Sequence, residues 1–107
     1  MVDIMGLMKK AQAVQAKMKD VQEELERLEV EGQSGGGMVK ITLNAKGQMK
    51  AIALDPTLMK PEESEIVEDL ILAAHADARA KADRVTEEKM AAVTAGLPLP
   101  PGMKLPF

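Results

Sequence analysis

Apolar residues recur at alternating steps of three and four through the first part of the chain, and this repeat limits the fold more than any other feature. The repeat consists of Ile4, Leu7, Ala11, Val14, Met18, Val21, Leu25 and Leu28. Such spacing forms the a/d seam of a heptad pattern, so it predicts a single helix from about Asp3 to Glu29. At 1.5 Å per residue that helix is roughly 40 Å long. Gly32 is predicted to mark its end.

A small antiparallel sheet is predicted after this helix. Residues 38–44 alternate between apolar and polar side chains, residues 44–47 have turn chemistry, and residues 48–54 form a return strand. Residues 30–33 can add a short third strand, and Asp55-Pro56 ends the hairpin because proline does not continue a central strand. The side chains expected to point inward are those of Val39, Ile41, Leu43, Ile52 and Leu54.

A second long helix is predicted from about Glu62 to around Val93, with Gly96 as its cap. Residues 97–107 are rich in proline and are expected to be an extended tail. The fold class is therefore α+β: a long N-terminal helix, an antiparallel sheet of two or three strands and a long C-terminal helix. We expect a single domain over residues 1–96, followed by the tail.

The predicted helix and sheet differ in length, and this difference indicates a homodimer. Strands of about seven residues span roughly 23 Å, so the first helix must extend beyond its own sheet with its apolar seam uncovered. An exposed apolar stripe of that size normally marks an interface. The residues predicted to form the dimer interface are Ile4, Leu7, Ala11, Val14, Val39, Ile41, Leu43, Ile52 and Leu54.

The glycines between Gly32 and Gly37 could suggest a phosphate-binding loop, but their context argues against one. Such a loop needs a lysine and a hydroxyl residue after its last glycine, where this chain has Met38 and Val39. The loop must also lead from a strand into a helix, and here the order is reversed. We interpret the glycines as a flexible connection that lets the first helix leave the sheet at an angle.

The residue inventory argues against an enzyme. The chain has no cysteine and one histidine, His75, so the usual zinc sites and thiol chemistry are excluded. Paired acids at the start of the second helix are explained by the helix dipole. We therefore expect no catalytic residue, metal, cofactor or small-molecule substrate. No apolar stretch is long enough to span a membrane, and we expect a cytoplasmic protein without a membrane partner.

Charge is divided along the chain, although the net charge is only −3. Residues 1–19 carry four lysines and one aspartate, whereas residues 20–31 carry six acids and one arginine. Zones of this kind create local fields whatever the total charge. Lysines and arginines neutralise the phosphates of duplex DNA, and glutamine can reach base edges. The candidate DNA-binding residues are Lys9, Lys10, Gln12, Lys17, Lys19, Arg79, Lys81 and Arg84.

These candidates differ in how free their charges are expected to be. Arg79, Lys81 and Arg84 each have an acid four residues away, as does Lys19, and such pairs form on helices. Lys9 and Lys10 have no acid three or four residues away, so with Lys17 they are the strongest candidates. A solvated helix face explains these residues equally well.

A second function fits the composition. The chain has nine methionines, and methionine suits adaptable apolar surfaces, so a protein–protein adaptor or holdase-like helical module without direct DNA binding is the alternative. The tail contains Pro98 to Pro101, a P-x-x-P segment. Its apolar residues Met103, Leu105 and Phe107 suggest that it packs against something.

Several short segments, taken in order, resemble the YbaB/EbfC family of bacterial nucleoid-associated DNA-binding proteins. Five of them are Leu7–Gln12, Gly37–Thr42, Leu54–Pro56, Glu68–Ile71 with Ala73-Ala74, and Glu88–Met90; the sixth is the terminal Pro100–Phe107. His75 and Ala76 replace the family's usual aromatic and asparagine. The resemblance implies a tweezer-like homodimer that binds double-stranded DNA, associates with the nucleoid and affects transcription.

Overall fold

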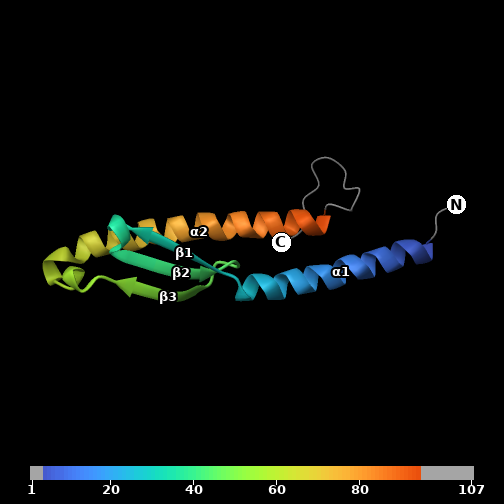
Figure 1. The fold of residues 1–107 in the computed structure, drawn as a ribbon, viewed down its shortest axis with the longest axis horizontal. Helices are drawn as coiled ribbons and strands as arrows, with labels where there is room; N and C mark the ends of the chain where they lie inside the picture. The colour runs from blue at the N-terminus through green and yellow to red at the C-terminus, as the bar shows by residue number, and fades with distance from the viewer. Residues whose placement is uncertain (1–3, 95–107) are drawn as a thin grey trace.

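A computed structural model describes residues 4–94, which form two long helices and a three-stranded sheet (Figure 1). Three short 3₁₀ turns cover residues 35–37, 56–58 and 61–63. The helices and strands are α1 (Ile4–Arg27), β1 (Glu29–Ser34), β2 (Val39–Asn44), β3 (Met49–Leu54) and α2 (Ser64–Thr94). The predicted α+β class is confirmed, and the short third strand exists as β1. The Gly96 cap and the tail lie outside the described residues.

The sheet is antiparallel, with the strand order β1-β2-β3. Gly32 pairs with Ile41, which in turn pairs with Ile52, so these three positions lie on one face. A register shift between Thr42 and Leu43 interrupts the β2–β3 ladder. Gly47, at φ +92°, closes the hairpin turn in a conformation that glycine adopts without strain.

Helix α2 covers the inner face of β1 and β2, and the main core lies between them. Val39, Ile41 and Leu43 are fully buried there against Ala74 and Ala78. These three strand residues therefore have no surface to offer a second chain. Their assignment to the dimer interface is corrected: the chain's own helix covers them.

Gly32 is the point of closest approach between the sheet and α2, which differs from its predicted role at the end of the first helix. Helix α1 ends at Arg27, and Gly32 is buried within β1. A Cβ atom at Gly32 would lie 2.2 Å from both the Ala74 carbonyl oxygen and the Ala78 nitrogen. Only glycine lets β1 pass this close to the alanines of α2.

Residues 35–37 connect β1 to β2, and they do not join a helix to the sheet as predicted. All three glycines have positive φ angles, with Gly36 at +67°. Such angles are costly for residues with a Cβ, so this run permits a tight connection between neighbouring strands. The end of α1 instead contacts the β2–β3 turn, through the Ala45 N–H.

The outer edge of β1 is fastened to α2 by side-chain hydrogen bonds. Lys81 Nζ donates to the Glu31 carbonyl oxygen at 2.8 Å, and the Gln33 N–H donates to Asp77 Oδ2 at 3.1 Å. Ser34 Oγ donates to the Leu70 carbonyl oxygen. The first two bonds occupy backbone groups of β1 that an edge strand otherwise leaves open to pairing with another chain.

Strand β3 lies beyond the part of the sheet that α2 covers. Ile52 shares a face with the buried Ile41, yet it is 45% exposed, and Met49 is 49% exposed. Ile52 thus lies on the inner face of the sheet, as predicted, at a part of that face that α2 does not cover. Leu54 is half-buried and contacts the main core. The sheet has one covered part and one apolar part open to solvent.

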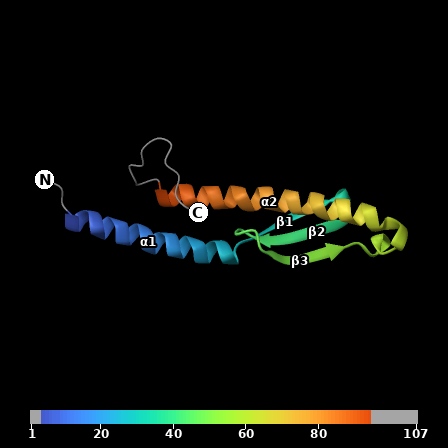
Figure 2. The same cartoon turned by 180° about the vertical axis from the view of Figure 1, so that it is seen from behind.

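Helix α1 is packed over its second half only. Leu25, Ala45 and Met90 form a second core, against which Met18 and Val21 pack. Residues 4–17, which we call the arm, extend past the end of α2, as Figures 1 and 2 show from opposite sides. We call the remaining described residues the body. The predicted extension of the first helix beyond its sheet is confirmed.

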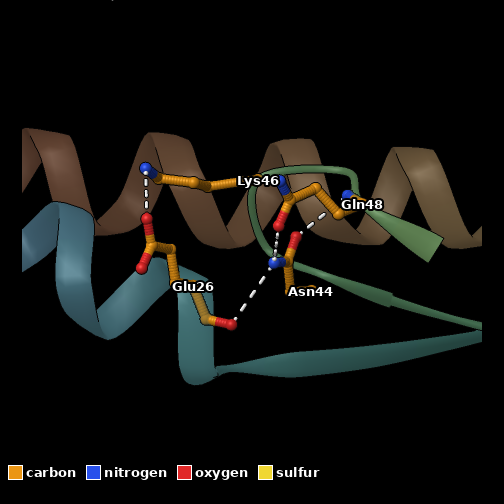
Figure 3. A network of polar contacts seen from close by, with 4 residues as sticks. All are labelled: Glu26, Asn44, Lys46 and Gln48. Carbon is orange, nitrogen blue, oxygen red and sulfur yellow. Dashed lines mark hydrogen bonds and ion pairs between the residues drawn. The ribbon is translucent and has the colours of Figure 1, made fainter. Parts of the chain in front are cut away.

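The β2–β3 turn holds the C-terminal end of α1 at Glu26 (Figure 3). The Ala45 N–H donates to the carbonyl oxygens of Leu25 and Leu28, at 3.1 and 2.8 Å. Asn44, which is fully buried, donates through Nδ2 to the Glu26 carbonyl oxygen at 3.3 Å. Together these donors satisfy carbonyls that a helix end leaves without partners.

Candidate functional site

The lysines of α1 are the candidate contacts for a polyanion. Lys9, Lys10, Lys17 and Lys19 are all exposed. Within residues 4–94 the ion pairs are Lys46–Glu26, Arg79–Asp83, Lys81–Asp77 and Lys89–Glu24, and none involves these four lysines. Their charges are therefore available to phosphate groups, which lysine neutralises without base specificity.

Helical geometry places these lysines around the apolar stripe of the arm. At 100° per residue, Lys10 and Lys17 lie on one side of the stripe, about 10 Å apart along the axis. Lys19 and Gln12 lie on its other side, and Lys9 points away from it. Cationic side chains thus flank the stripe on both sides, while the acidic residues of α1 begin at Asp20. The described arm carries no acidic residue.

Two of the candidate DNA-binding cations on α2 form ion pairs within that helix. Arg79 Nε lies 3.2 Å from Asp83 Oδ1, and Lys81 Nζ lies 3.2 Å from Asp77 Oδ2. Both predicted helix pairs are confirmed. The Gln33 N–H and the Lys81 ammonium hold the pKa of Asp77 below its ordinary value. The described contacts make Lys81 a part of the sheet edge as well as a surface cation.

Arg84 and Lys19 behave differently from this prediction. Each was expected to pair with an acid four residues along its helix, Glu88 and Glu23 respectively. Neither pair is among the ion pairs of the described residues, and both cations are exposed. Arg84 therefore presents a charge on the body, separate in sequence and in space from the arm lysines.

A cleft below the hairpin turn contains a cation that the sequence did not single out. Lys46 and Arg79 line it together with Asp83, and its volume is about 440 Å³. The Arg79 guanidinium lies directly over Gly47, and a Cβ atom at that position would displace it. Lys46 Nζ lies 3.0 Å from Glu26 Oε1 and Arg79 pairs with Asp83, so the charges here are balanced. Lys46 was missed because a single lysine in a turn has no distinctive pattern.

The apolar residues predicted at the dimer interface divide into two groups. Val39, Ile41 and Leu43 are buried in the body, as described above. The others keep surface that a partner can contact: Ile4 is 67% and Leu7 56% exposed. The remaining members of this group are Ala11, Val14, Ile52 and Leu54.

Few other groups in the described chain suggest chemistry. His75 is half-buried on α2. Between residues 4 and 94, no three or more His, Asp or Glu side chains gather into a candidate metal site. Over the same residues, neither helix combines the length and apolar character that crossing a bilayer requires.

Comparison with known proteins gives consistent matches over the full length. The sequence model described as the YbaB/EbfC DNA-binding family matches residues 1–97. Proteins named "Nucleoid-associated protein" from Methylocella silvestris and Brucella ovis are 64% and 54% identical over 107 residues, and a similarly named one from Agrobacterium fabrum is 57% identical. Each alignment covers all of both chains.

The fold also matches an experimental structure. The crystal structure of an uncharacterized protein from Helicobacter pylori aligns with a TM-score of 0.76, over 90% of this chain and 100% of that chain. Sequence identity is 20%, so this likeness concerns the fold alone.

Proposed function

Because the chain belongs to the YbaB/EbfC DNA-binding family, we propose that it is a nucleoid-associated protein that binds double-stranded DNA as a homodimer. The observation that supports this most is the set of unpaired lysines on α1. They lie on and beside a projecting arm, whereas Arg79 and Lys81 on the body are held in ion pairs. An arm of this kind can lie against a duplex and contact its phosphates without the body intervening.

A duplex suits this surface better than a single strand does. Proteins that bind single-stranded nucleic acid stack its bases on aromatic rings. The single aromatic residue of this chain is Phe107, and the arm has none. Contacts through lysine need no ring, and Gln12 lies beside the stripe where its amide could reach a base edge. We therefore propose binding that depends mainly on the DNA backbone.

The open part of the sheet supports the homodimer. Met49 and Ile52 are about half exposed on the inner face, next to a core that α2 covers. A second copy packed over Ile52 and Leu54 would bury this surface and hold two arms at a distance from each other. In such a dimer the two lysine-bearing arms would lie on either side of a gap that a DNA duplex could enter, as in a tweezer-like structure.

Binding that depends mainly on the DNA backbone supports a broad role in the cell. Binding through phosphates carries little sequence information, which suits a protein that organises the nucleoid and influences the transcription of many genes. The acidic residues from Asp20 onwards and around residues 55–69 would repel a wrapped duplex. We therefore expect modest affinity, with contacts concentrated on the arm, and a location in the cytoplasm at the nucleoid.

The exposed methionines support a second candidate, a protein–protein adaptor or holdase-like module. Met5, Met8, Met49 and Met59 are each at least 49% exposed. Their flexible side chains suit irregular apolar partners. Binding of that kind would depend weakly on salt and would be insensitive to the arm lysines, so one experiment separates the two functions.

The experiment is a salt titration of duplex binding, with a matched single strand, for the wild type and two double variants. Lys9→Ala/Lys10→Ala removes two arm charges, and Lys40→Ala/Lys60→Ala removes two exposed charges from the body. The logarithm of affinity should fall linearly with the logarithm of salt concentration. The arm variant should weaken binding and flatten that slope by about two units, one for each lost contact.

The body variant is the control, because it changes the net charge equally. It should leave the slope close to that of the wild type. Equal slopes for all three proteins would remove the arm from the interface, and a wild-type slope near zero would favour the adaptor. Sedimentation of the free protein over a range of concentrations tests the dimer separately.

A further inference from the structure

The largest apolar exposure in the described chain lies on the arm. Ile4, Met5, Leu7 and Met8 are between 56% and 72% exposed. Ile4 and Leu7 continue into Ala11 and Val14 as one line, which we call the arm stripe. Soluble proteins rarely leave a contiguous apolar surface of this kind without a partner. The stripe therefore has an occupant that residues 4–94 do not supply.

Helix α2 ends beside the C-terminal end of this stripe. Ala92 and Val93, near its last residue, line a groove of about 280 Å³ together with Lys17 and Val21 of α1. The two helices run in opposite directions, so α2 leads toward the tip of the arm (Figures 1 and 2). A chain that continues past Thr94 in the same direction meets Val14 first, then Ala11 and Leu7.

The sequence that follows α2 has the pattern of an extended segment with one apolar side. Its apolar residues recur at every second position in two runs, separated mainly by proline: Leu97 and Leu99, then Met103, Leu105 and Phe107. Proline favours extended conformations and reduces the entropy that docking costs. The apolar side of such a segment is more stable when buried against a narrow apolar surface than when exposed to water.

The segment is also long enough to cover the arm stripe. The arm spans about 20 Å from Lys17 to Ile4 at 1.5 Å per residue. The residues after Thr94 number 13, and in a strand-like extended conformation, in which alternate side chains share one side, they span about 43 Å. Leu97 would lie about 10 Å beyond the end of α2, at the level of Ala11.

We propose that residues 97–107 lie along the arm stripe of their own chain and cover Ile4, Leu7, Ala11 and Val14. This occupant replaces the second copy that the heptad spacing predicts at these four residues. The dimer contact proposed above then depends on the open part of the sheet. The docked segment leaves Lys9, Lys10 and Lys17 of the arm accessible and adds Lys104 to them.

Disulfide trapping tests this placement, because the natural chain has no cysteine to interfere. Ala11→Cys/Leu97→Cys places one thiol on the stripe, and Ala13→Cys/Leu97→Cys places it on the opposite side of the helix. Ala11 and Ala13 are both exposed and lie about 3 Å apart along the axis. The tether to Leu97 is therefore nearly the same for both pairs.

Under a mild oxidant, the stripe pair should form an intrachain disulfide at least about tenfold faster than the opposite pair, since docking raises the local thiol concentration at the stripe. The rate should not change with protein concentration. A chain that ends at Gly96 should show faster amide hydrogen exchange in residues 4–17 than the full chain does.

Three results would overturn the proposal. Equal trapping rates for the two pairs would show that the segment has no preference for the stripe. Disulfide-linked dimers of the single Ala11→Cys variant would place a second copy's helix on the stripe. Unchanged exchange in the truncated chain would show that residues 97–107 do not protect the arm.

Discussion

The two halves of α1 share one apolar repeat and are used in opposite ways. Leu25 belongs to the body and is 2% exposed, whereas Leu7 belongs to the arm and is 56% exposed. Both occupy the same seam of the same helix, and they differ only in what lies over them. Met90 and Ala45 cover Leu25, and no described residue beyond α1 itself buries Leu7. Apolar spacing identifies the face of a helix that seeks a partner, but it does not identify the partner.

The body and the arm also differ in whether their cations form ion pairs. In the body, Arg79, Lys81 and Lys89 each lie within 3.2 Å of a carboxylate oxygen. On the arm, Lys9 and Lys10 have no acid in reach along the helix, and they stay exposed. Ion pairs at the surface stabilise a fold weakly, but they withdraw cations from other partners. Leaving the arm lysines unpaired costs little stability and keeps their charge for a ligand.

Among single substitutions, the largest loss of stability is expected at Gly32, where β1 and α2 approach each other most closely. Gly32→Ala places a Cβ atom 2.2 Å from backbone atoms of Ala74 and Ala78, so β1 and α2 must separate. We expect a loss of about 3 kcal/mol or more in the free energy of unfolding. Urea unfolding followed by circular dichroism, at one protein concentration, measures it.

Gly36→Ala is the matched control for this substitution. Gly36 has a positive φ of +67° but no atom within 4 Å of an added Cβ. Only backbone strain remains, which costs about 1 kcal/mol. Equal losses for the two variants would mean that Gly32 matters for its conformation and not for the close approach of α2.

The contact between the β2–β3 turn and the C-terminal end of α1 should show the next effect. Asn44→Ala removes the donor to the Glu26 carbonyl oxygen and the acceptor of the Gln48 N–H, which lies 2.9 Å away. Leaving these part-buried backbone groups without partners costs about 1 kcal/mol. Amide exchange should rise in the last turns of α1 more than in α2. Uniform exchange across both helices would show that the turn does not hold the end of α1.

Much of the fold was predictable from local pattern, and what was not predictable depended on contacts distant in sequence. The heptad repeat predicted α1, and the alternation in residues 38–54 predicted the β2–β3 hairpin. Gly32 was misread because nothing near it in sequence indicates that Ala74 and Ala78 will lie against it. Alternation placed Ile52 on the inner face of the sheet, but the width of that face covered by α2 depends on the tertiary fold.

The candidate site divides in a similar way. The pairing of Arg79 and Lys81 with acids four residues away followed from helix geometry. The hydrogen bond from Lys81 to the Glu31 carbonyl oxygen did not, because it joins residues 50 positions apart. Lys46 was overlooked for the same reason: its partner Glu26 is on α1 and becomes its neighbour only when the turn caps that helix.

The smallest effect is expected at the β1 edge, where the charge of Asp77 helps to hold strand and helix together. Hydrogen bonds from the Gln33 N–H and Lys81 lower the pKa of Asp77 from 3.8. A carboxylate with a lowered pKa stabilises the fold above pH 3.8, and this contribution is lost as pH falls through the lower, folded-state value. Asp77→Asn should therefore be less stable than the wild type at pH 6 and should lose less stability between pH 5 and pH 2.

Asp55 provides an independent comparison for the same titration. Its pKa is lowered by hydrogen bonds from the hydroxyl and the backbone N–H of Thr57, and it lies in a turn that has no contact with the β1 edge. Asp55→Asn should flatten the pH profile in the same direction, and the two changes should add because the sites share no partner. Urea unfolding at several pH values measures both. If Asp77→Asn retained the wild-type profile, the Gln33 and Lys81 bonds would be too weak in solution to close the edge, and β1 would be as open to a second chain as β3 is.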